Sequence, residues 1–293
     1  MISLLAPAKV NLYLHVGAPG PDGYHPLVSL VTFADVGDLI GSSRDEVPAF
    51  ELRLEGAFAA ALRDEPDNLV VRAIRELAEI GGGETPRIRL HLWKELPIAA
   101  GLGGGSSDAA AALRLVRPHF PDVSDDQLMG ILGRLGADAP MCLAARPVIA
   151  SGRGDVLSPA PPMPPMHAVL VNPGVACPTP QIYAAFDRAG RFQPPAPGAL
   201  REAYGDVRVL AGDLAHCRND LEPVACAFDP RVGEPIDLLS SRPETLLARL
   251  SGSGATSFAL CAGQDEAAAL ADYVSTAQPS WWVKACTLGA PSR

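Results

Sequence analysis

A glycine-dense segment between residues 97 and 108 has the composition in this sequence that best suits a chemical task. It reads Pro-Ile-Ala-Ala-Gly-Leu-Gly-Gly-Gly-Ser-Ser-Asp and runs into an alanine-rich stretch of helical character. Glycines at four of the five positions 101–105 let the backbone approach a ligand closely, because no Cβ stands in the way. A helix beginning there would point unpaired N–H groups and the positive end of its dipole at that ligand. We therefore expect this segment to bind a polyphosphate.

Other interpretations of the glycine segment fit less well. A plain strand-to-helix turn usually needs only about one or two glycines. The P-loop pattern ends in Gly-Lys-Ser/Thr, and no lysine follows these glycines. A dinucleotide fingerprint that starts at Gly101 has Ser106 in place of its third glycine, and one that starts at Gly103 ends on Asp108. The segment is thus a phosphate loop of a third type.

Lys9 and Asn11 form a second candidate, two residues apart in a segment where aliphatic and polar residues alternate. The alternation predicts a half-buried strand over residues 8–16, with both side chains on its polar face about 7 Å apart. From periodicity alone, a solvated lysine on the wet side of a strand is the favoured interpretation, and a reactive pair is the alternative.

Two further candidates are weak when taken singly. Asp138 follows a predicted helix that begins at Ser124 and ends at Gly136. It suits either the cap of a short new helix with Pro140 near its start or a functional carboxylate, and the two roles are compatible. His25 follows a turn and an aromatic residue, and a histidine in that setting is more often a plain surface residue.

The elements that must position these residues mix strands and helices in a pattern that favours an α+β fold over a doubly wound sheet. The strands are expected at residues 8–16, 27–33, 88–93, 167–171, 256–261 and 281–286. The helices are expected at residues 68–80 with Asp67 or Asn68 as cap, from Ser106–Asp108 to Pro118, from Ser124 to Gly136, at 182–188, near Ile236, at 244–249 and at 264–277.

Length and proline content indicate two domains. A chain of 293 residues exceeds the size that one hydrophobic core usually supports. Five prolines fall within the nine residues from Ser158 to Met166, which is the clearest break in composition. We expect domains at residues 1–158 and 159–293.

Charge and cysteine usage exclude several classes of protein. A formal charge of -9 argues against a nucleic-acid or anionic-membrane partner. No apolar run approaches the ~18 residues of a membrane span, and Lys9 and Asn11 interrupt any signal-peptide core. The six cysteines are scattered without a CxxC pair, so we expect reduced thiols and a cytoplasmic protein.

Taken together, the candidates acquire a meaning that none has alone. Their order and spacing resemble those of the GHMP kinases, and within them the branch that phosphorylates 4-diphosphocytidyl-2-C-methyl-D-erythritol. The similarity covers nearly the whole chain apart from Arg191 to Val209 and the last few residues. It rests on Pro7-Ala-Lys9-Val-Asn11-Leu, Asp22-Gly-Tyr24-His25, Pro97 to Ser107, Gly136-Ala-Asp138-Ala-Pro140, Pro173-Gly174, Pro178-Thr-Pro180, Asn219-Asp220 and Ser251-Gly-Ser-Gly-Ala255.

The resemblance implies a fold and a reaction. The fold would be an N-terminal ATP-binding domain like domain 2 of ribosomal protein S5, with a left-handed βαβ unit, and a ferredoxin-like C-terminal domain, with the site in the cleft between them. The reaction would be phosphoryl transfer from ATP to the 2-hydroxyl of the cytidine diphosphate methylerythritol, in the non-mevalonate route to isoprenoid precursors. Mg²⁺ would accompany ATP, but the sequence offers no glutamate to pair with the loop serine, so its ligands stay open. A weak homodimer is compatible with the resemblance.

The resemblance also implies roles for individual residues. Asp138 would be the base and Lys9 its electrostatic partner, and Asn11 would orient the substrate hydroxyl or its phosphates. Asn68 and Lys94 would frame adenine. Tyr24 and Tyr183 would sandwich the cytosine, His25 would read its edge, and Thr179 would also contact the substrate. The ATP phosphates would be bound by Pro97, Ile98, Ala99, Ala100, Gly101, Leu102, Gly103, Gly104, Gly105, Ser106 and Ser107.

Two alternatives stay open at this point. Another GHMP kinase, acting on homoserine or mevalonate, would lack the Asp22–His25 turn. A nucleotide or metabolite sensor on the same fold, without catalytic activity, would not need an intact Lys9 and Asp138. A purely structural scaffold is disfavoured by the glycine loop.

Overall fold

A computed structural model describes residues 2–43, 47–63 and 68–289 of the chain. The strands are β1 (Ile2–Val16), β2 (Leu27–Ser42), β3 (Glu51–Glu55), β4 (Arg89–Trp93), β5 (Val148–Gly152), β6 (Val156–Pro159), β7 (Met166–Asn172), β8 (Thr245–Leu250), β9 (Ser257–Cys261) and β10 (Trp282–Gly289). The α-helices are α1 (Leu69–Ile80), α2 (Gly104–Val116), α3 (Asp125–Leu135), α4 (Ala139–Ala144), α5 (Thr179–Ala189), α6 (Val207–Leu214), α7 (Glu222–Phe228), α8 (Glu234–Ser240) and α9 (Gln264–Ala277). Short 3-10 turns lie at Ala59–Leu62, Arg117–His119 and Pro230–Val232.

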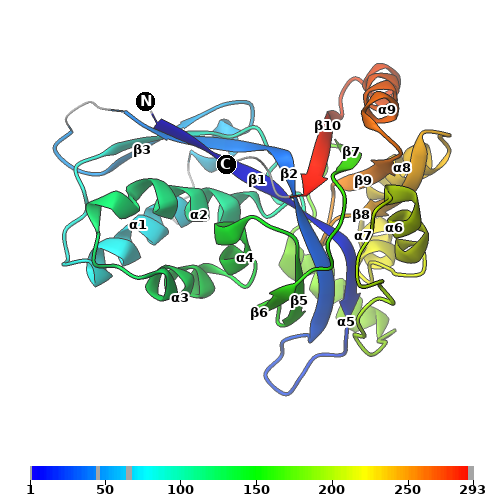
Figure 1. The fold of residues 1–293 in the computed structure, drawn as a ribbon, viewed down its shortest axis with the longest axis horizontal. Helices are drawn as coiled ribbons and strands as arrows, with labels where there is room; N and C mark the ends of the chain where they lie inside the picture. The colour runs from blue at the N-terminus through cyan, green and yellow to red at the C-terminus, as the bar shows by residue number, and fades with distance from the viewer. Residues whose placement is uncertain (1, 44–46, 64–67, 290–293) are drawn as a thin grey trace.

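One sheet connects the two halves of the molecule. Within the described residues it has ten strands, with the order β3-β4-β2-β10-β7-β9-β8 and with β1 and β5 also paired to β2. The strands pair antiparallel except β3 and β4, which are parallel. The long β1–β2 hairpin runs through both halves, and β10 returns from the C-terminal half to pair with β2 (Figure 1). The mixed strands and helices confirm the α+β class.

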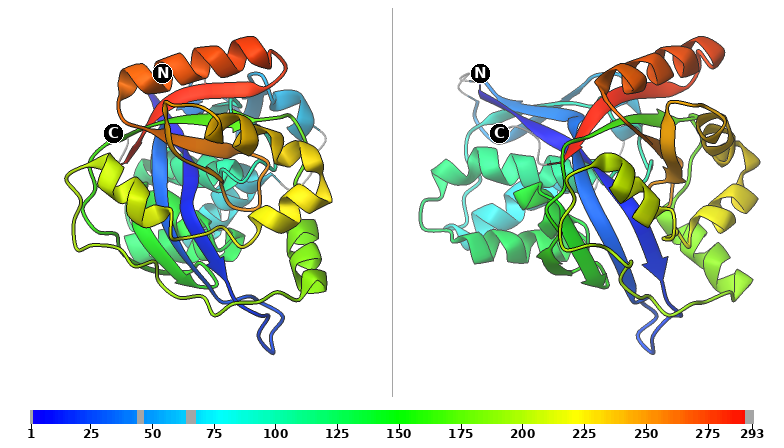
Figure 2. Two further views of the ribbon diagram at one scale, coloured as in Figure 1. Left: turned by 90° about the vertical axis from the view of Figure 1, so that its right-hand side faces the viewer. Right: turned by 45° about the vertical axis from the view of Figure 1, so that its right-hand side comes forward.

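Helices cover the sheet separately in two lobes. Helices α1 to α4 form the N-terminal lobe, and α5 to α9 belong to the C-terminal lobe (Figure 1). Helix α9 lies along β10 in both views of Figure 2. Among the described residues, no helix is both long and apolar enough to span a membrane. The boundary expected at residue 158 falls at the end of β6 and stays a prediction, because a continuous sheet joins the lobes.

Local signals located most helices correctly. Asn68 caps α1 by accepting a hydrogen bond from Val70 N at 2.9 Å, whereas the alternative cap Asp67 lies outside the described residues. Ser124 and Gln127 form a reciprocal capping box at the start of α3. Helix α9 has the bounds expected from the sequence. These ends depend on side chains within a few residues of each other, which is why the sequence predicts them.

Two expectations about strands are wrong. Residues 244–249 were expected to be helical, since leucine, alanine and arginine favour helices. Residues 245–249 lie instead in β8, where antiparallel pairing with β9 satisfies the backbone. The strand around Lys9 was expected to be half-buried, but β1 is buried on both faces from Ala6 to Val16. Its polar side chains therefore face the protein interior rather than water.

Candidate active site

The glycine loop joins β4 to α2 in a conformation that leaves the helix start uncapped. Gly103 is the N-cap residue of α2 and has a left-handed backbone, with φ of 62°. Among the described residues, no side-chain cap hydrogen bond is made at this helix start. The N–H groups of that turn, and the positive end of the dipole of a 13-residue helix, are thus left for an anion.

Two residues at the expected start of α2, Ser107 and Asp108, have other partners. The helix begins at Gly104, earlier than expected, so Ser107 and Asp108 lie inside its first turns. The Ser107 hydroxyl donates to the carbonyl of Pro7 at 2.7 Å and ties the helix to β1. Ser106 is partly exposed on the same turn. The uncapped helix start favours anion binding, because a side-chain cap would compete with an anion for the same N–H groups.

A second glycine turn, formed by residues 251–254, packs against the glycine loop. The Ser251 hydroxyl donates to the carbonyl of Gly101 at 3.0 Å, and Thr256 N donates to the carbonyl of Ala100 at 3.1 Å. A Cβ on Gly101 would lie 2.2 Å from the carbonyl oxygen of Ser251, and its φ is 74°. Glycine is therefore required at position 101 both by its left-handed backbone and by the approach of the other chain segment.

Lys9, Asn11 and Asp138 meet beside this loop. The ammonium of Lys9 lies 2.8 Å from Asp138 Oδ2 and 2.9 Å from Asn11 Oδ1. The Lys9 side chain is 6% exposed and that of Asp138 is 45% exposed. Lys9 is thus no solvated lysine. It is a buried cation that holds a carboxylate which itself stays accessible to a ligand.

Irregularities in β1 lie on either side of this pair. The register between β1 and β2 shifts between Pro7 and Lys9 and again between Asn11 and Tyr13. Such bulges re-aim side chains and are common beside active sites. They cannot be derived from the alternation of residues, which assumes an unbroken strand.

Asn11 is held in one orientation by partners from three segments. Its Nδ2 donates to Ser29 Oγ at 2.7 Å, and Ser29 Oγ donates to the carbonyl of Tyr13 at 2.6 Å. Its backbone N–H donates to Ser251 Oγ at 3.2 Å. The amide oxygen therefore faces Lys9. Ser29 was not expected in the site, because nothing in its local sequence distinguishes it from other strand serines.

Asp138 lies at the N-cap position of α4, as the capping interpretation predicted. Its side chain makes no capping hydrogen bond, however, and pairs with Lys9 instead. Its backbone carbonyl accepts from Cys142 Sγ at 3.2 Å, and burial raises the pKa of that thiol to about 12. Cys142 therefore stays a protonated, structural residue.

His25 is buried, contrary to the interpretation as a surface histidine. Its Nδ1 lies 2.8 Å from the carbonyl oxygen of Gly17, and its Nε2 lies 3.1 Å from Asp187 Oδ1 on α5. Its ring is 5.1 Å from that of Tyr183. Burial, with a smaller contribution from Asp138, raises the pKa of Tyr183 above its ordinary value.

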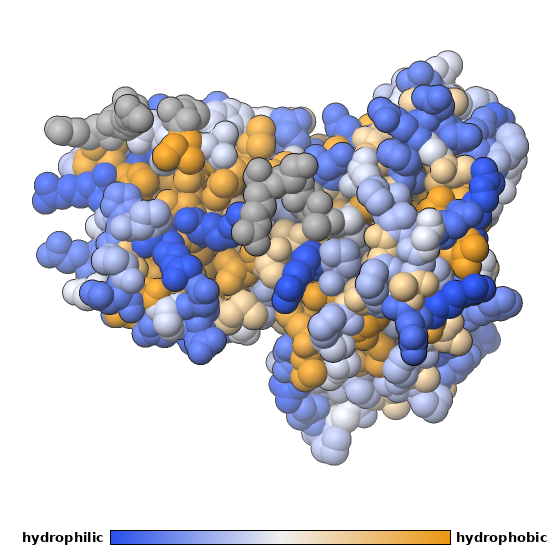
Figure 3. All heavy atoms as spheres, in the orientation of Figure 1, coloured by the Kyte–Doolittle hydropathy of each residue, from blue (hydrophilic) through white to orange (hydrophobic). Residues whose placement is uncertain are grey.

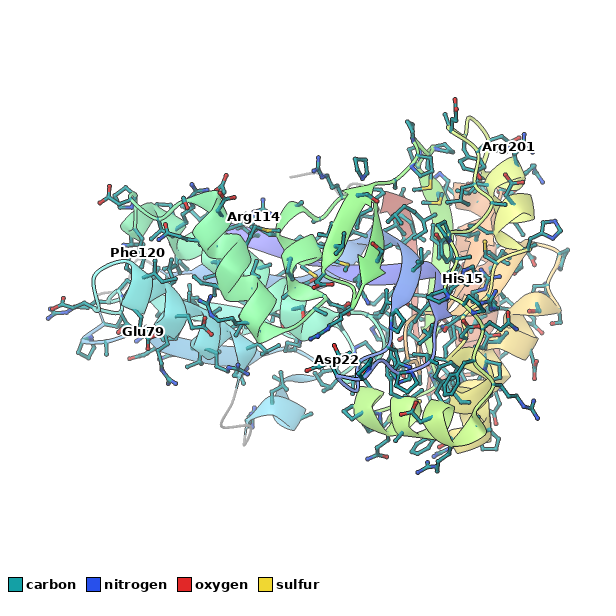
Figure 4. The ribbon with its side chains drawn as sticks, turned by 90° about the horizontal axis from the view of Figure 1, so that it is seen from below. His15, Asp22, Glu79, Arg114, Phe120 and Arg201 are labelled. Carbon is teal, nitrogen blue, oxygen red and sulfur yellow. The ribbon has the colours of Figure 1, made fainter. Side chains whose placement is uncertain are left out.

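Tyr24 is 58% exposed beside His25, and an arginine covers one face of its ring. The guanidinium of Arg153 lies 4.1 Å from the ring centre and pairs with Asp22. Figure 4 shows Asp22 in the β1–β2 connection, on the side where the lobes meet. A pocket of about 500 Å³ is lined here by Gly20, Pro21, Asp22, Tyr24, Pro26, Gly152 and Arg153. Sequence reasoning missed Arg153.

The other expected ligand residues lie around this arrangement. Thr179 Oγ1 is 2.9 Å from Ser253 Oγ and so links α5 to the second glycine turn. Asn68 is engaged as the cap of α1. Lys94 is 2% exposed, and its ammonium contacts two buried carboxylates. An adenine contact by Asn68 or Lys94 stays a prediction, and in this structure their side chains serve other partners.

The described residues offer no carboxylate cage for a metal ion. They contain no group of three or more His, Cys, Asp or Glu side chains placed to hold one. On the face drawn in Figure 3, hydrophilic and apolar side chains are interspersed over both lobes. Any Mg²⁺ would depend largely on phosphate oxygens and water, as is usual for this ion.

Comparison with known proteins agrees with the geometry. Residues 68–146 match the family model "GHMP kinases N terminal domain", and residues 199–279 match "GHMP kinases C terminal". Two relatives named 4-diphosphocytidyl-2-C-methyl-D-erythritol kinase are similar over nearly their full lengths. The protein of Caulobacter sp. (strain K31) is 52% identical over 99% of each chain. That of Cereibacter sphaeroides (strain KD131 / KCTC 12085) is 46% identical over 97% of this chain and 98% of the relative.

Solved structures show the same fold. The crystal structure of a 4-(cytidine 5'-diphospho)-2C-methyl-D-erythritol kinase matches with a TM-score of 0.78 and 33% identity, over 98% of this chain and 99% of the other. The L. major mevalonate kinase in complex with R-mevalonate matches with a TM-score of 0.71 and 15% identity, over 100% and 97% of the two chains. The second likeness concerns the fold alone.

Proposed function

The chain belongs to the 4-diphosphocytidyl-2-C-methyl-D-erythritol kinases of the GHMP kinase family, and we propose that Asp138 is the base of its reaction. The enzyme transfers a phosphoryl group from ATP to the 2-hydroxyl of 4-diphosphocytidyl-2-C-methyl-D-erythritol, giving the 2-phosphate and ADP. This is a step of the non-mevalonate route to isoprenoid precursors. The observation that carries the mechanistic proposal is the 2.8 Å pair of Lys9 and Asp138 beside the glycine loop.

The proposed transfer needs little covalent chemistry from the protein. Asp138 accepts the proton of the 2-hydroxyl, the resulting alkoxide oxygen bonds to the terminal phosphorus of ATP, and the bond from that phosphorus to ADP breaks. Positioning and charge neutralisation then account for most of the rate. Lys9 supports both stages, because its ammonium stabilises negative charge on the carboxylate and on the developing alkoxide. Asn11 orients the hydroxyl from the same strand.

The glycine loop supplies the ATP end of the site. Its uncapped N–H groups at the start of α2 offer donors to phosphate oxygens. Lys9 N donates to the carbonyl of Leu102 at 2.8 Å, so the loop is fastened to the strand that carries the base partner. This link supports a short, fixed separation between the terminal phosphate and Asp138.

The acceptor end is proposed to lie between the β1–β2 connection and α5. Tyr24 and Tyr183 would stack on cytosine, and His25 would read its edge. In the structure Arg153 occupies one face of Tyr24, so the base either uses the other face or displaces the guanidinium. Base–aromatic stacking contributes about 1–3 kcal/mol per base, so the cytidine end supplies much of the binding free energy for a small polyol.

Mg²⁺ is proposed to enter with ATP and to neutralise phosphate charge when bound. The partly exposed Ser106 hydroxyl in the first turn of α2 would be an oxygen donor for the ion beside the phosphates. We propose a cytoplasmic location, supported by six free cysteines of which five are buried. The weak homodimer and the lack of a nucleic-acid partner stay predictions.

A substrate panel tests the function. With purified protein and ATP, ADP release should be fastest with the cytidylated alcohol as acceptor. Free methylerythritol should show kcat/KM at least about tenfold lower, because it lacks the base that stacks on the aromatics. Mevalonate and homoserine should not be phosphorylated. Equal turnover of either would overturn the assignment of the acceptor, and binding of both substrates without ADP release would favour a sensor.

A further inference from the structure

A fully buried ion cluster lies behind the phosphate loop. The ammonium of Lys94 lies 2.7 Å from Asp108 Oδ2 and also donates to Asp38 Oδ2. The three side chains are 2%, 3% and 0% exposed, respectively. They come from three elements, because Lys94 follows β4, Asp108 belongs to α2 and Asp38 to β2.

The cluster holds both ends of the loop. Lys94 precedes the segment 97–103 and Asp108 follows it, so their contact closes the loop at its base. The second carboxylate oxygen of Asp38 accepts hydrogen bonds from the backbone of Glu95 at 2.7 Å and of Leu96 at 2.9 Å. One aspartate thus fixes the approach to the loop while the lysine joins that approach to the helix behind it.

Lys94 has no polar group turned toward solvent. Its backbone N–H donates to the carbonyl of Glu55 at 2.7 Å, and its carbonyl accepts from Phe58 N at 3.0 Å. With the ammonium buried between two acids, contact with a nucleobase would require breaking this cluster. The expected adenine-framing role therefore has no free donor on this residue.

The composition of the cluster indicates that it fixes the shape of the glycine loop. Burying three charged groups costs free energy that their attraction often does not recover, so apolar residues would commonly serve stability as well. Two carboxylates share one ammonium, and Asp108 Oδ1 has no hydrogen-bond partner. Burial raises the pKa of Asp108 above its ordinary value despite the nearby ammonium, which reflects the free-energy cost of burying this carboxylate. An arrangement with this free-energy cost indicates that directional hydrogen bonds are needed at the base of the glycine loop.

We infer that Lys94, Asp38 and Asp108 are positioning residues that hold the glycine loop in the shape that receives a triphosphate. The inference rests on the proposed function only in taking ATP as the ligand of this loop. In this inference the cluster acts through the backbone N–H groups at the start of α2, and its side chains bind neither the nucleobase nor the acceptor alcohol. Loss of the cluster should therefore weaken the binding of every nucleoside triphosphate by the same factor, whatever its nucleobase.

The test uses ligands that separate phosphate from base. Lys94→Met leaves two buried acids without a cation and can prevent folding, so Asp108→Asn is the main variant, since it leaves Lys94 paired with Asp38. We expect the Kd values of ATP and of inorganic tripolyphosphate to rise by one common factor of about ten. Adenosine, measured as a competitor of ATP, should bind as it does to the unmodified protein.

Controls distinguish this role from general damage. Leu270→Ala, on the buried face of α9, should lower Tm without changing tripolyphosphate binding. Weaker adenosine binding with unchanged tripolyphosphate binding would show that the cluster supports adenine binding instead. Unchanged binding of both ligands, or equal loss of both, would also overturn the inference. These measurements omit the cytidylated alcohol, so they do not depend on which acceptor the enzyme uses.

Discussion

Replacing Asp138 with asparagine should lower kcat by roughly 10² to 10⁴, the usual contribution of a positioned general base. The amide still accepts a hydrogen bond from Lys9, so the local structure is kept, but it does not take the proton of an alcohol. KM for ATP should change little, because the phosphate loop is built from other residues. Single-turnover kinetics at saturating substrates measures the loss at the chemical step.

Asp126→Asn is a matched control for this variant. Asp126 is an exposed aspartate in the first turn of α3, so its substitution changes the net charge equally in the neighbouring helix. It should leave kcat unchanged. If Asp138→Asn retained nearly full kcat, or if Asp126→Asn lost as much, Asp138 would not be the base.

Replacing Gly101 with alanine should reduce kcat/KM for ATP by about 10², since small displacements of positioning groups cost that much. The new Cβ would lie 2.2 Å from the carbonyl oxygen of Ser251 and 2.9 Å from Gly254 N. Neither backbone atom can yield without separating the two glycine turns. Left-handed strain and overpacking together should lower the free energy of unfolding by about 3 kcal/mol. ATP titrations and thermal denaturation measure the two effects.

Gly174→Ala separates strain from overlap. Gly174 has nearly the same φ, 77° against 74°, but a Cβ there would meet nothing within 4 Å. This variant should lose only the smaller stability that left-handed strain removes, and it should bind ATP normally. If the two variants behaved alike, the contact between the glycine turns would not matter for ATP binding.

The sequence predicts those parts of the fold whose causes are local. Helices α1 and α3 are marked by caps, with Asn68 and Ser124 each bonding an N–H two or three residues away. The phosphate loop is recognisable in the sequence because its left-handed backbone, at Gly101 and Gly103, requires glycine at those positions. Lys9, Asn11 and Asp138 were identified through the family resemblance, and periodicity alone favoured a solvated lysine.

The remaining features depend on partners that are distant in the chain. Lys94 and Asp38 are 56 residues apart, and His25 meets Asp187 across the molecule. Their burial follows from the assembled sheet and not from their neighbours in sequence. Strand β8 shows the same limit, because its helix-favouring residues become a strand only by pairing with β9. The serine network around Asn11 likewise joins β1, β2 and the second glycine turn.

The central claim is that Asp138 receives the proton of the acceptor hydroxyl while Lys9 holds the Asp138 carboxylate in place. A crystal structure with the cytidylated alcohol and a non-hydrolysable ATP analogue measures this directly. We predict the 2-hydroxyl oxygen within hydrogen-bond distance of the Asp138 carboxylate, about 2.6–3.2 Å, in line with the terminal phosphorus and with the Lys9 contact intact. A hydroxyl bound elsewhere, with Asp138 turned away from both it and Lys9, would contradict the account.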